Sequence, residues 1–130
     1  ELAGEVDFFS IGTNDLVQYT LAVDRGNANI SYLYNHFNPA VLRLVQRTIT
    51  SARENGIWAG MCGEMASDPN AAVLLMAMGI NELSMSAPSI PRVKEKIRSI
   101  SSVKAKEILA DVMTMEDGDD IRNYLQKILG

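Results

Sequence analysis

Three short β-type runs alternate along the chain with segments of helical periodicity, and this alternation limits the possible folds more than any other feature. The runs cover residues 6–11, 57–62 and 82–86. Gly12 ends the first run and Gly63 ends the second. The predicted order is β-α-α-β-α-β-α-α-α. Strands that alternate with helices are joined by right-handed crossovers and form a parallel sheet. The sequence therefore predicts an α/β fold with parallel strands.

The two best-marked helices have clear starts and ends. Asn38 and Pro39 place a capping residue and a proline where a helix begins, and Pro69 marks the start of the next helix. Gly56 and Gly79 follow these helices, and glycine readily adopts the left-handed conformation that closes a helix. These signals predict helices that begin near residues 39 and 69.

Three strands are too few for either of the common folds built on a parallel sheet, because both faces of such a sheet are normally covered. A closed eight-stranded barrel needs roughly 250 residues. The 130 residues hold about three strand-helix units. We therefore expect residues 1–130 to form the last three strand-helix units of a TIM (β/α)8 barrel, truncated at the N-terminus. The chain begins with Glu1 rather than Met, which favours this interpretation. Open strands invite pairing, so we also expect self-association.

Composition excludes several classes of function. The chain has 12 basic and 16 acidic residues, a net charge of -4, and no basic run, which argues against nucleic-acid binding. No apolar stretch is long enough to predict a membrane span. One cysteine and one histidine cannot form an internal disulfide or a Cys/His zinc site. A reducing, cytoplasmic location is the natural expectation.

In a barrel of this kind the active site lies at the C-terminal ends of the strands. After the first run, Gly12 and the following residues combine a glycine, backbone N–H groups and a helix start, which suits an anion. Asp15 adds a hard carboxylate suited to Mg²⁺, and Arg25 adds a fork of donors suited to phosphate. Simple helix capping by residues 13–15 and a surface arginine would explain the same residues.

Cys62 stands at the end of the second run, and two nearby glycines would let a ligand approach the backbone. A thiol at this position could donate a proton. A buried structural cysteine is the alternative, since free cysteines are often buried. His36 lies in an irregular segment with no acidic partner nearby in the sequence, so we interpret it as a packing or solvent-facing histidine.

The residues at these strand ends resemble a known enzyme family. The similarity is to the C-terminal barrel of phosphoenolpyruvate-protein phosphotransferases, the Enzyme I family of the bacterial sugar phosphotransferase system. The segments that carry it are 8–16, 18–27, 60–64 and 82–91. Together they extend over roughly residues 6–100. Pyruvate phosphate dikinase and phosphoenolpyruvate synthase share the Gly-Thr/Ser-Asn-Asp-Leu and Cys-Gly-Glu/Gln patterns. Residues 22–27 and 84–86 favour the phosphotransferase.

The resemblance implies a role for each candidate residue. Asp15 is expected to be one of two Mg²⁺ ligands, and Asn14 and Arg25 are expected to bind the phosphate of phosphoenolpyruvate. Cys62 is expected to protonate C3 of enolpyruvate, which gives pyruvate. The family transfers the phosphoryl group to a histidine on a separate N-terminal domain, and from there to a small phosphocarrier protein. The family barrel also forms homodimers.

Several parts of the family site are missing from these 130 residues. They include the second metal carboxylate, the upstream arginines and lysine, and the phosphohistidine domain, whose motif does not include His36. We therefore expect the chain by itself to be inactive. Two alternatives stay open: a fragment of a pyruvate phosphate dikinase or phosphoenolpyruvate synthase, and a non-catalytic dimerisation module.

Overall fold

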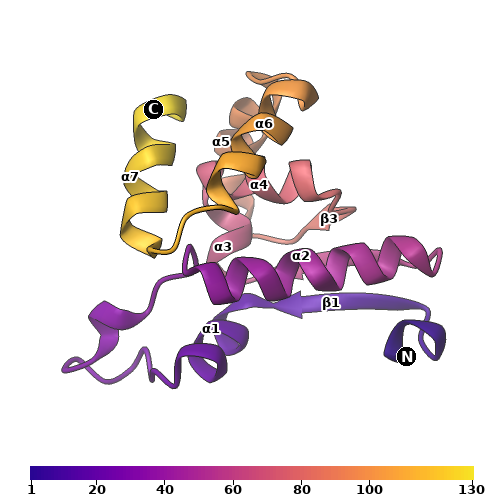
Figure 1. Cartoon of the computed structure of the whole chain (residues 1–130), viewed down its shortest axis with the longest axis horizontal. Coiled ribbons are helices and arrows are strands. Elements are labelled where there is room, and N and C mark those ends of the chain that lie inside the picture. The colour runs from indigo at the N-terminus through magenta and orange to yellow at the C-terminus, as the bar shows by residue number, and fades with distance from the viewer.

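A three-stranded parallel sheet organises the chain in the computed structural model, which describes all of residues 1–130 (Figure 1). The strands are β1 (Phe8–Gly12), β2 (Trp58–Cys62) and β3 (Glu82–Leu83), in the order β1-β2-β3. The predicted α/β fold with parallel strands is confirmed.

The chain also contains seven α-helices and three short 3-10 turns. The α-helices are α1 (Thr13–Leu21), α2 (Pro39–Glu54), α3 (Glu64–Ser67), α4 (Pro69–Met78), α5 (Ile90–Arg98), α6 (Ser102–Val112) and α7 (Gly118–Leu129). The 3-10 turns are η1 (Leu2–Gly4), η2 (Ser31–Leu33) and η3 (Ala87–Ser89). No helix is long and apolar enough to cross a membrane.

The third strand is shorter than the predicted run 82–86. Only Glu82–Leu83 pairs as a strand, and the Ser84 N–H adds one further bond to the carbonyl of β2 residue Met61 at 2.8 Å. The ladder stops there because the chain turns into η3. That turn contains Pro88, which fixes φ and carries no backbone N–H.

The predicted helix boundaries at α2 and α4 are confirmed by their caps. The Asn38 side chain accepts a bond of 2.9 Å from the backbone N–H of Ala40 at the start of α2. The Asp68 side chain accepts hydrogen bonds from two backbone N–H groups at the start of α4, at 2.8 Å and 3.0 Å. Gly56 and Gly79 have φ values of +71° and +94°, the left-handed conformation expected after a helix.

The start of α1 departs from the sequence-based interpretation. The helix begins directly at Thr13, its N-cap is Gly12, and no side chain caps it. The alternative that residues 13–15 serve as simple capping side chains is therefore wrong. The Thr13 and Asn14 side chains instead form hydrogen bonds to the chain around the end of β2.

One face of the sheet forms the core with α2 and α4. Ile11, Ala59 and Met61 point to this face and are at most 7% exposed. Helix α4 is apolar on every side and packs against α2, α3, α5, α6 and α7. This position explains why its residues 71–75 are all buried.

The alternate residues of β1 and β2 point away from those helices. Phe8 and Trp58 stack there with ring centroids 5.1 Å apart, and they are 50% and 40% exposed. Gly60 makes room for this pair, since a Cβ at residue 60 would lie 2.8 Å from the Trp58 ring. Helices therefore cover one face of the sheet, while the other presents an exposed aromatic pair.

Candidate functional site

The C-terminal ends of β1 and β2 lie side by side. Gly12 is the partner of Cys62 in the parallel register, so both strands end at the same level. The hydroxyl of Thr13, whose residue is only 1% exposed, donates to the carbonyl of Cys62 at 2.9 Å. This buried bond fixes the first turn of α1 against the end of β2.

Gly63 allows these two segments to approach so closely. Its φ is +98°, in the region that favours glycine. A Cβ at residue 63 would lie 2.5 Å from the Thr13 hydroxyl and 3.0 Å from the Asn14 amide oxygen. Any other residue would therefore be strained and would push α1 away from β2.

Asn14 is held in one orientation by two donors. Its Oδ1 accepts from the backbone N–H of Glu64 at 3.1 Å and from the Tyr34 hydroxyl at 3.2 Å. An amide oxygen can accept two hydrogen bonds, so both acceptor positions are filled. The Nδ2 group makes no bond within the chain and can donate two N–H groups to an anion.

Arg25 reaches the same point from the loop after α1. Its Nη1 lies 3.3 Å from Oε1 of Glu64, and its backbone N–H donates to Gln18 Oε1 at 3.1 Å. The side chains of Arg25 and Glu64 are 47% and 60% exposed. The predicted residues Asn14 and Arg25 are thus brought together, and Glu64 contacts both.

Asp15 and Cys62 complete the set of predicted residues. Asp15 lies in the first turn of α1, and its side chain is exposed. Cys62 is a free, exposed cysteine, so the alternative of a buried structural cysteine is wrong. No group of three or more His, Cys, Asp or Glu side chains gathers as a ready metal site. One exposed hard carboxylate still fits Mg²⁺, which is commonly held by one or two carboxylates together with substrate phosphates.

A hollow of about 410 Å³ adjoins Asn14 and Glu64. Asp15, Arg25 and Cys62 do not line it. Asn14 and Glu64 line one part of it, and Ser84 and Ser86 from the segment after β3 line another. His36 and Asp68 also line it, from the segment before α2 and the start of α4. All three predicted strand ends therefore contribute to one polar opening.

The structure corrects the interpretation of His36 as a histidine without an acidic partner. Its Nε2 lies 3.3 Å from Asp68 Oδ2, and its ring packs against Phe37 with centroids 4.4 Å apart. Burial acts to raise the pKa of Asp68. The hydrogen bond from His36, its charge, and the backbone bonds at the start of α4 outweigh burial, so the pKa lies below its usual value.

Tyr34 is a site residue that the sequence analysis missed. Burial raises the pKa of its hydroxyl, the negative charge of Glu64 adds to this, and Arg25 opposes it. The hydroxyl is therefore a stable neutral donor to Asn14 at physiological pH. A tyrosine 20 residues from its partner in an irregular segment gives no sequence signal of this role.

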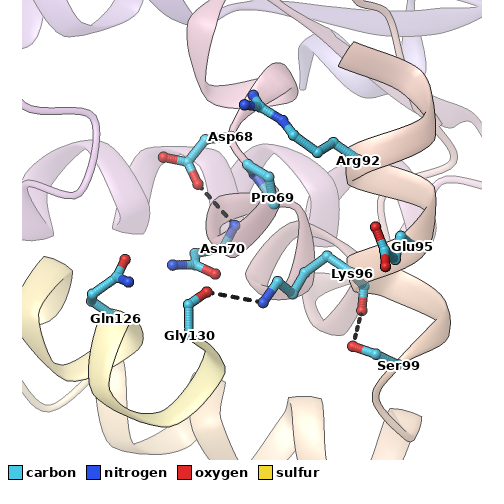
Figure 2. Close-up of a pocket in the computed structure, with 9 residues that line it drawn as sticks. All are labelled: Asp68, Pro69, Asn70, Arg92, Glu95, Lys96, Ser99, Gln126 and Gly130. Atoms are coloured by element: carbon cyan, nitrogen blue, oxygen red, sulfur yellow. Dashed lines mark hydrogen bonds between the residues drawn. The ribbon is translucent and has the colours of Figure 1, made fainter. Parts of the chain in front are cut away.

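A larger polar pocket of about 600 Å³ lies elsewhere, between the start of α4, helix α5 and the end of α7 (Figure 2). Hydrogen bonds at this pocket join helix α5 to the end of α7. Lys96 of α5 points to the end of α7 and donates to the carbonyls of Leu129 and Gly130. Such a cation is favourable at a helix C-terminus. None of the predicted residues Asn14, Asp15, Arg25 and Cys62 lines this pocket, whereas Asn14 lines the smaller hollow, so the larger pocket is not the candidate site.

Comparison with known proteins identifies the family. A sequence model described as "PEP-utilising enzyme, PEP-binding domain" matches residues 1–102. The chain belongs to this family. The match includes the three strands and every predicted site residue, so the resemblance found in the sequence is confirmed.

Three relatives show how close the similarity is. Proteins named phosphoenolpyruvate-protein phosphotransferase are 58% identical over 85% of the chain in Haemophilus influenzae and 52% identical over 98% in Buchnera aphidicola subsp. Acyrthosiphon pisum. The protein of that name in Lactococcus lactis subsp. lactis is 50% identical over 90% of the chain. The chain spans 19%, 22% and 21% of these relatives, respectively.

Proposed function

We propose that this chain supplies part of the phosphoenolpyruvate site of a phosphoenolpyruvate-protein phosphotransferase. The observation that carries the proposal is that Asn14 and Arg25 both contact Glu64, which lies two residues after the exposed Cys62. Asn14 offers only N–H donors, and Arg25 keeps most of its guanidinium free. Both donors suit a phosphate group. The names of the relatives favour a phosphotransferase over a dikinase or synthase.

Different side chains would bind the phosphate group and the metal ion. Arg25 and the Nδ2 group of Asn14 would hold phosphate oxygens. Asp15, together with oxygens of the substrate, would hold Mg²⁺, which neutralises charge that develops on the phosphoryl group. In the chemical step phosphorus would form a bond to a nitrogen of the acceptor histidine while its bond to the bridging oxygen breaks, and the electron pair of the broken bond stays on that oxygen.

Cys62 would complete the reaction on the organic product. The resulting enolate accepts a proton at C3 from the thiol, which converts it to pyruvate and leaves a thiolate to be reprotonated. An exposed thiol at the end of β2 is accessible for this transfer. The acceptor of the phosphoryl group is a histidine on a separate domain. A phosphocarrier protein would then receive the group.

The architecture supports a place within a larger barrel. Three parallel strands in sequential order, with helices on one face only, match an arc of a TIM (β/α)8 barrel. In such a barrel the exposed pair Phe8 and Trp58 would point inward. We propose that residues 1–130 are the last three strand-helix units of that barrel, within a cytoplasmic homodimeric enzyme.

Alkylation of Cys62 tests the proposed site directly, because it is the only cysteine of these 130 residues. The rate of modification is measured by peptide mass spectrometry without ligand, with phosphoenolpyruvate alone, with Mg²⁺ alone and with both. The experiment is done on the 130-residue chain and on the protein as its gene encodes it. We expect the strongest protection with both ligands in the gene-encoded protein. Equal rates under all conditions in both proteins would contradict the proposal.

A further inference from the structure

The two residues proposed to hold phosphate are not independent, because one residue contacts both. Glu64 is the first residue of α3 and follows Cys62 by two positions. Its carboxylate contacts Arg25 and its backbone N–H contacts Asn14. We infer that Glu64 is a positioning residue of the phosphoenolpyruvate site, which holds Arg25 at the mouth of the site and keeps the amide of Asn14 turned toward the ligand. This inference rests on the proposed function.

The carboxylate of Glu64 orders a long and mobile side chain. A free arginine side chain loses rotamer entropy when it binds a ligand. The contact of 3.3 Å involves Nη1 of Arg25, and no other side chain forms a hydrogen bond or an ion pair with the guanidinium. The remaining N–H groups stay available for phosphate. Glu64 can therefore hold Arg25 in place before the ligand arrives and keep contact with it afterwards.

The backbone of Glu64 acts on Asn14 independently of the side chain. The bond of 3.1 Å to Asn14 Oδ1 exists because Gly63 lets the start of α3 approach α1. Tyr34 fills the second acceptor position of the same oxygen. A substitution of the Glu64 side chain leaves this backbone bond possible, so the effect on Arg25 can be measured separately.

The opposite role for Glu64 would be competition with the ligand. A carboxylate on a phosphate-binding arginine could repel a phosphate, and its removal would then tighten binding. The geometry favours positioning, because Glu64 occupies one edge of the guanidinium and is itself partly neutralised there. The two roles give changes of opposite sign, and one measurement separates them.

The test compares Glu64→Ala, Glu64→Gln and Arg25→Ala, with the double variant Glu64→Ala/Arg25→Ala, in the protein as its gene encodes it. Glu107→Ala is the matched control, because Glu107 forms an ion pair of 3.0 Å with Lys104 on α6 and is similarly exposed. The quantity measured is the phosphoenolpyruvate concentration that gives half-maximal protection of Cys62 with Mg²⁺ present. We expect Glu64→Ala to raise it about two- to fivefold, the range of an exposed ion pair.

Three further results are expected if Glu64 acts through Arg25. Gln can still accept from the guanidinium, so Glu64→Gln restores most of the affinity. Glu64→Ala has no additional effect once Arg25 is replaced, and Glu107→Ala changes nothing. Without any ligand, Arg25 in Glu64→Ala reacts faster with phenylglyoxal. A merely structural role would lower the unfolding midpoint without this dependence on Arg25.

The outcomes separate the inference from the proposed function. Unchanged or tighter binding in Glu64→Ala overturns the inference and leaves the phosphoenolpyruvate site standing. The inference is also overturned if Glu64→Ala weakens phosphoenolpyruvate binding equally in the protein with Arg25 and in the Arg25→Ala variant. If the unsubstituted protein shows no protection at any phosphoenolpyruvate concentration, the proposed function fails, and the inference fails with it.

Discussion

The two faces of the same strands differ sharply in what they contact. On one face, Ala59 and Met61 of β2 are at most 1% exposed beneath the helices. On the other, Phe8 and Trp58 remain about half exposed and stack on each other. Since strand residues alternate between faces, adjacent positions in the sequence have opposite roles. The covered face stabilises the fold, whereas the candidate site lies at the rim, which is formed by the C-terminal ends of β1 and β2 around Thr13 and Cys62.

The covered region and the rim also differ in the kind of contact that holds them. The covered region is held by many apolar contacts around α4, so the loss of one side chain there lowers the stability of the whole chain. The rim is held by single polar contacts, such as Thr13 to Cys62 and Arg25 to Glu64. Changes at the rim should therefore affect ligand binding more than stability, and the predictions that follow test this difference.

The largest effect is expected in the covered region. Leu74 of α4 is fully buried, so Leu74→Ala leaves a cavity and should lower the free energy of unfolding by about 2–5 kcal/mol. Urea denaturation followed by circular dichroism measures this change. Val103→Ala is the control, because Val103 is 67% exposed on α6 and its loss should have almost no effect. Similar values for both variants would contradict the assignment of α4 to the core.

Gly63→Ala should give the next largest loss of stability and the largest loss of ligand binding. A positive φ costs about 1–3 kcal/mol for a residue with a side chain. The new Cβ would also displace Thr13 and Asn14. Protection of Cys62 by phosphoenolpyruvate and Mg²⁺ should disappear in this variant. Gly4→Ala is the control, because a Cβ at residue 4 meets no atom within 4 Å. Retained protection in Gly63→Ala would show that this glycine does not set the site.

Thr13→Val should have a smaller effect on stability. The change removes the buried hydroxyl and leaves the Cys62 carbonyl without its side-chain donor, which costs about 1–3 kcal/mol. Thr13→Ser keeps the hydroxyl and should restore most of the loss. Urea denaturation gives the stability, and the alkylation rate of Cys62 reports whether the end of β2 has moved. A loss in Thr13→Ser as large as that in Thr13→Val would contradict the prediction, because the methyl group would then contribute as much as the hydrogen bond.

Features that depend on local sequence were predictable. The α2 and α4 caps follow from Asn38-Pro39 and Asp68-Pro69, because the capping atoms lie within three residues of their partners. Parallel strand order follows from the alternation of strands and helices. Arg25 was predicted from its chemistry and from the family resemblance, and Asn14 from the resemblance alone; in the structure both contact Glu64.

Long-range contacts between side chains were not predictable. Thr13, Tyr34 and His36 find their partners 49, 20 and 32 residues away in the chain. No periodicity connects such positions, and an isolated polar residue in a loop is usually solvated. The length of β3 was also mispredicted, because polar and apolar residues alternate through residues 82–86 as in a strand, but the following turn removes residues 84–86 from the ladder.

The smallest effect concerns Asp68 and its contact with His36 at the edge of the hollow. Because the pKa of Asp68 is lowered in the folded chain, its carboxylate stabilises the fold above its unfolded pKa, at about pH 4. This contribution is lost as the pH falls through the folded pKa. Asp68→Asn keeps a capping side chain but removes the charge, so it should lower stability at pH 6 by at most about 1 kcal/mol.

The decisive measurement is the difference in unfolding free energy between unsubstituted chain and Asp68→Asn, taken from pH 6 down to pH 2.5. The difference should shrink toward zero at the acid end, since the protonated Asp68 no longer attracts His36. Glu116→Gln removes an exposed carboxylate from the linker before α7 and serves as the control. A difference that stays constant with pH would show that Asp68 acts only as the cap of α4. The charge of the Asp68 carboxylate beside His36 would then make no contribution to the stability of the fold.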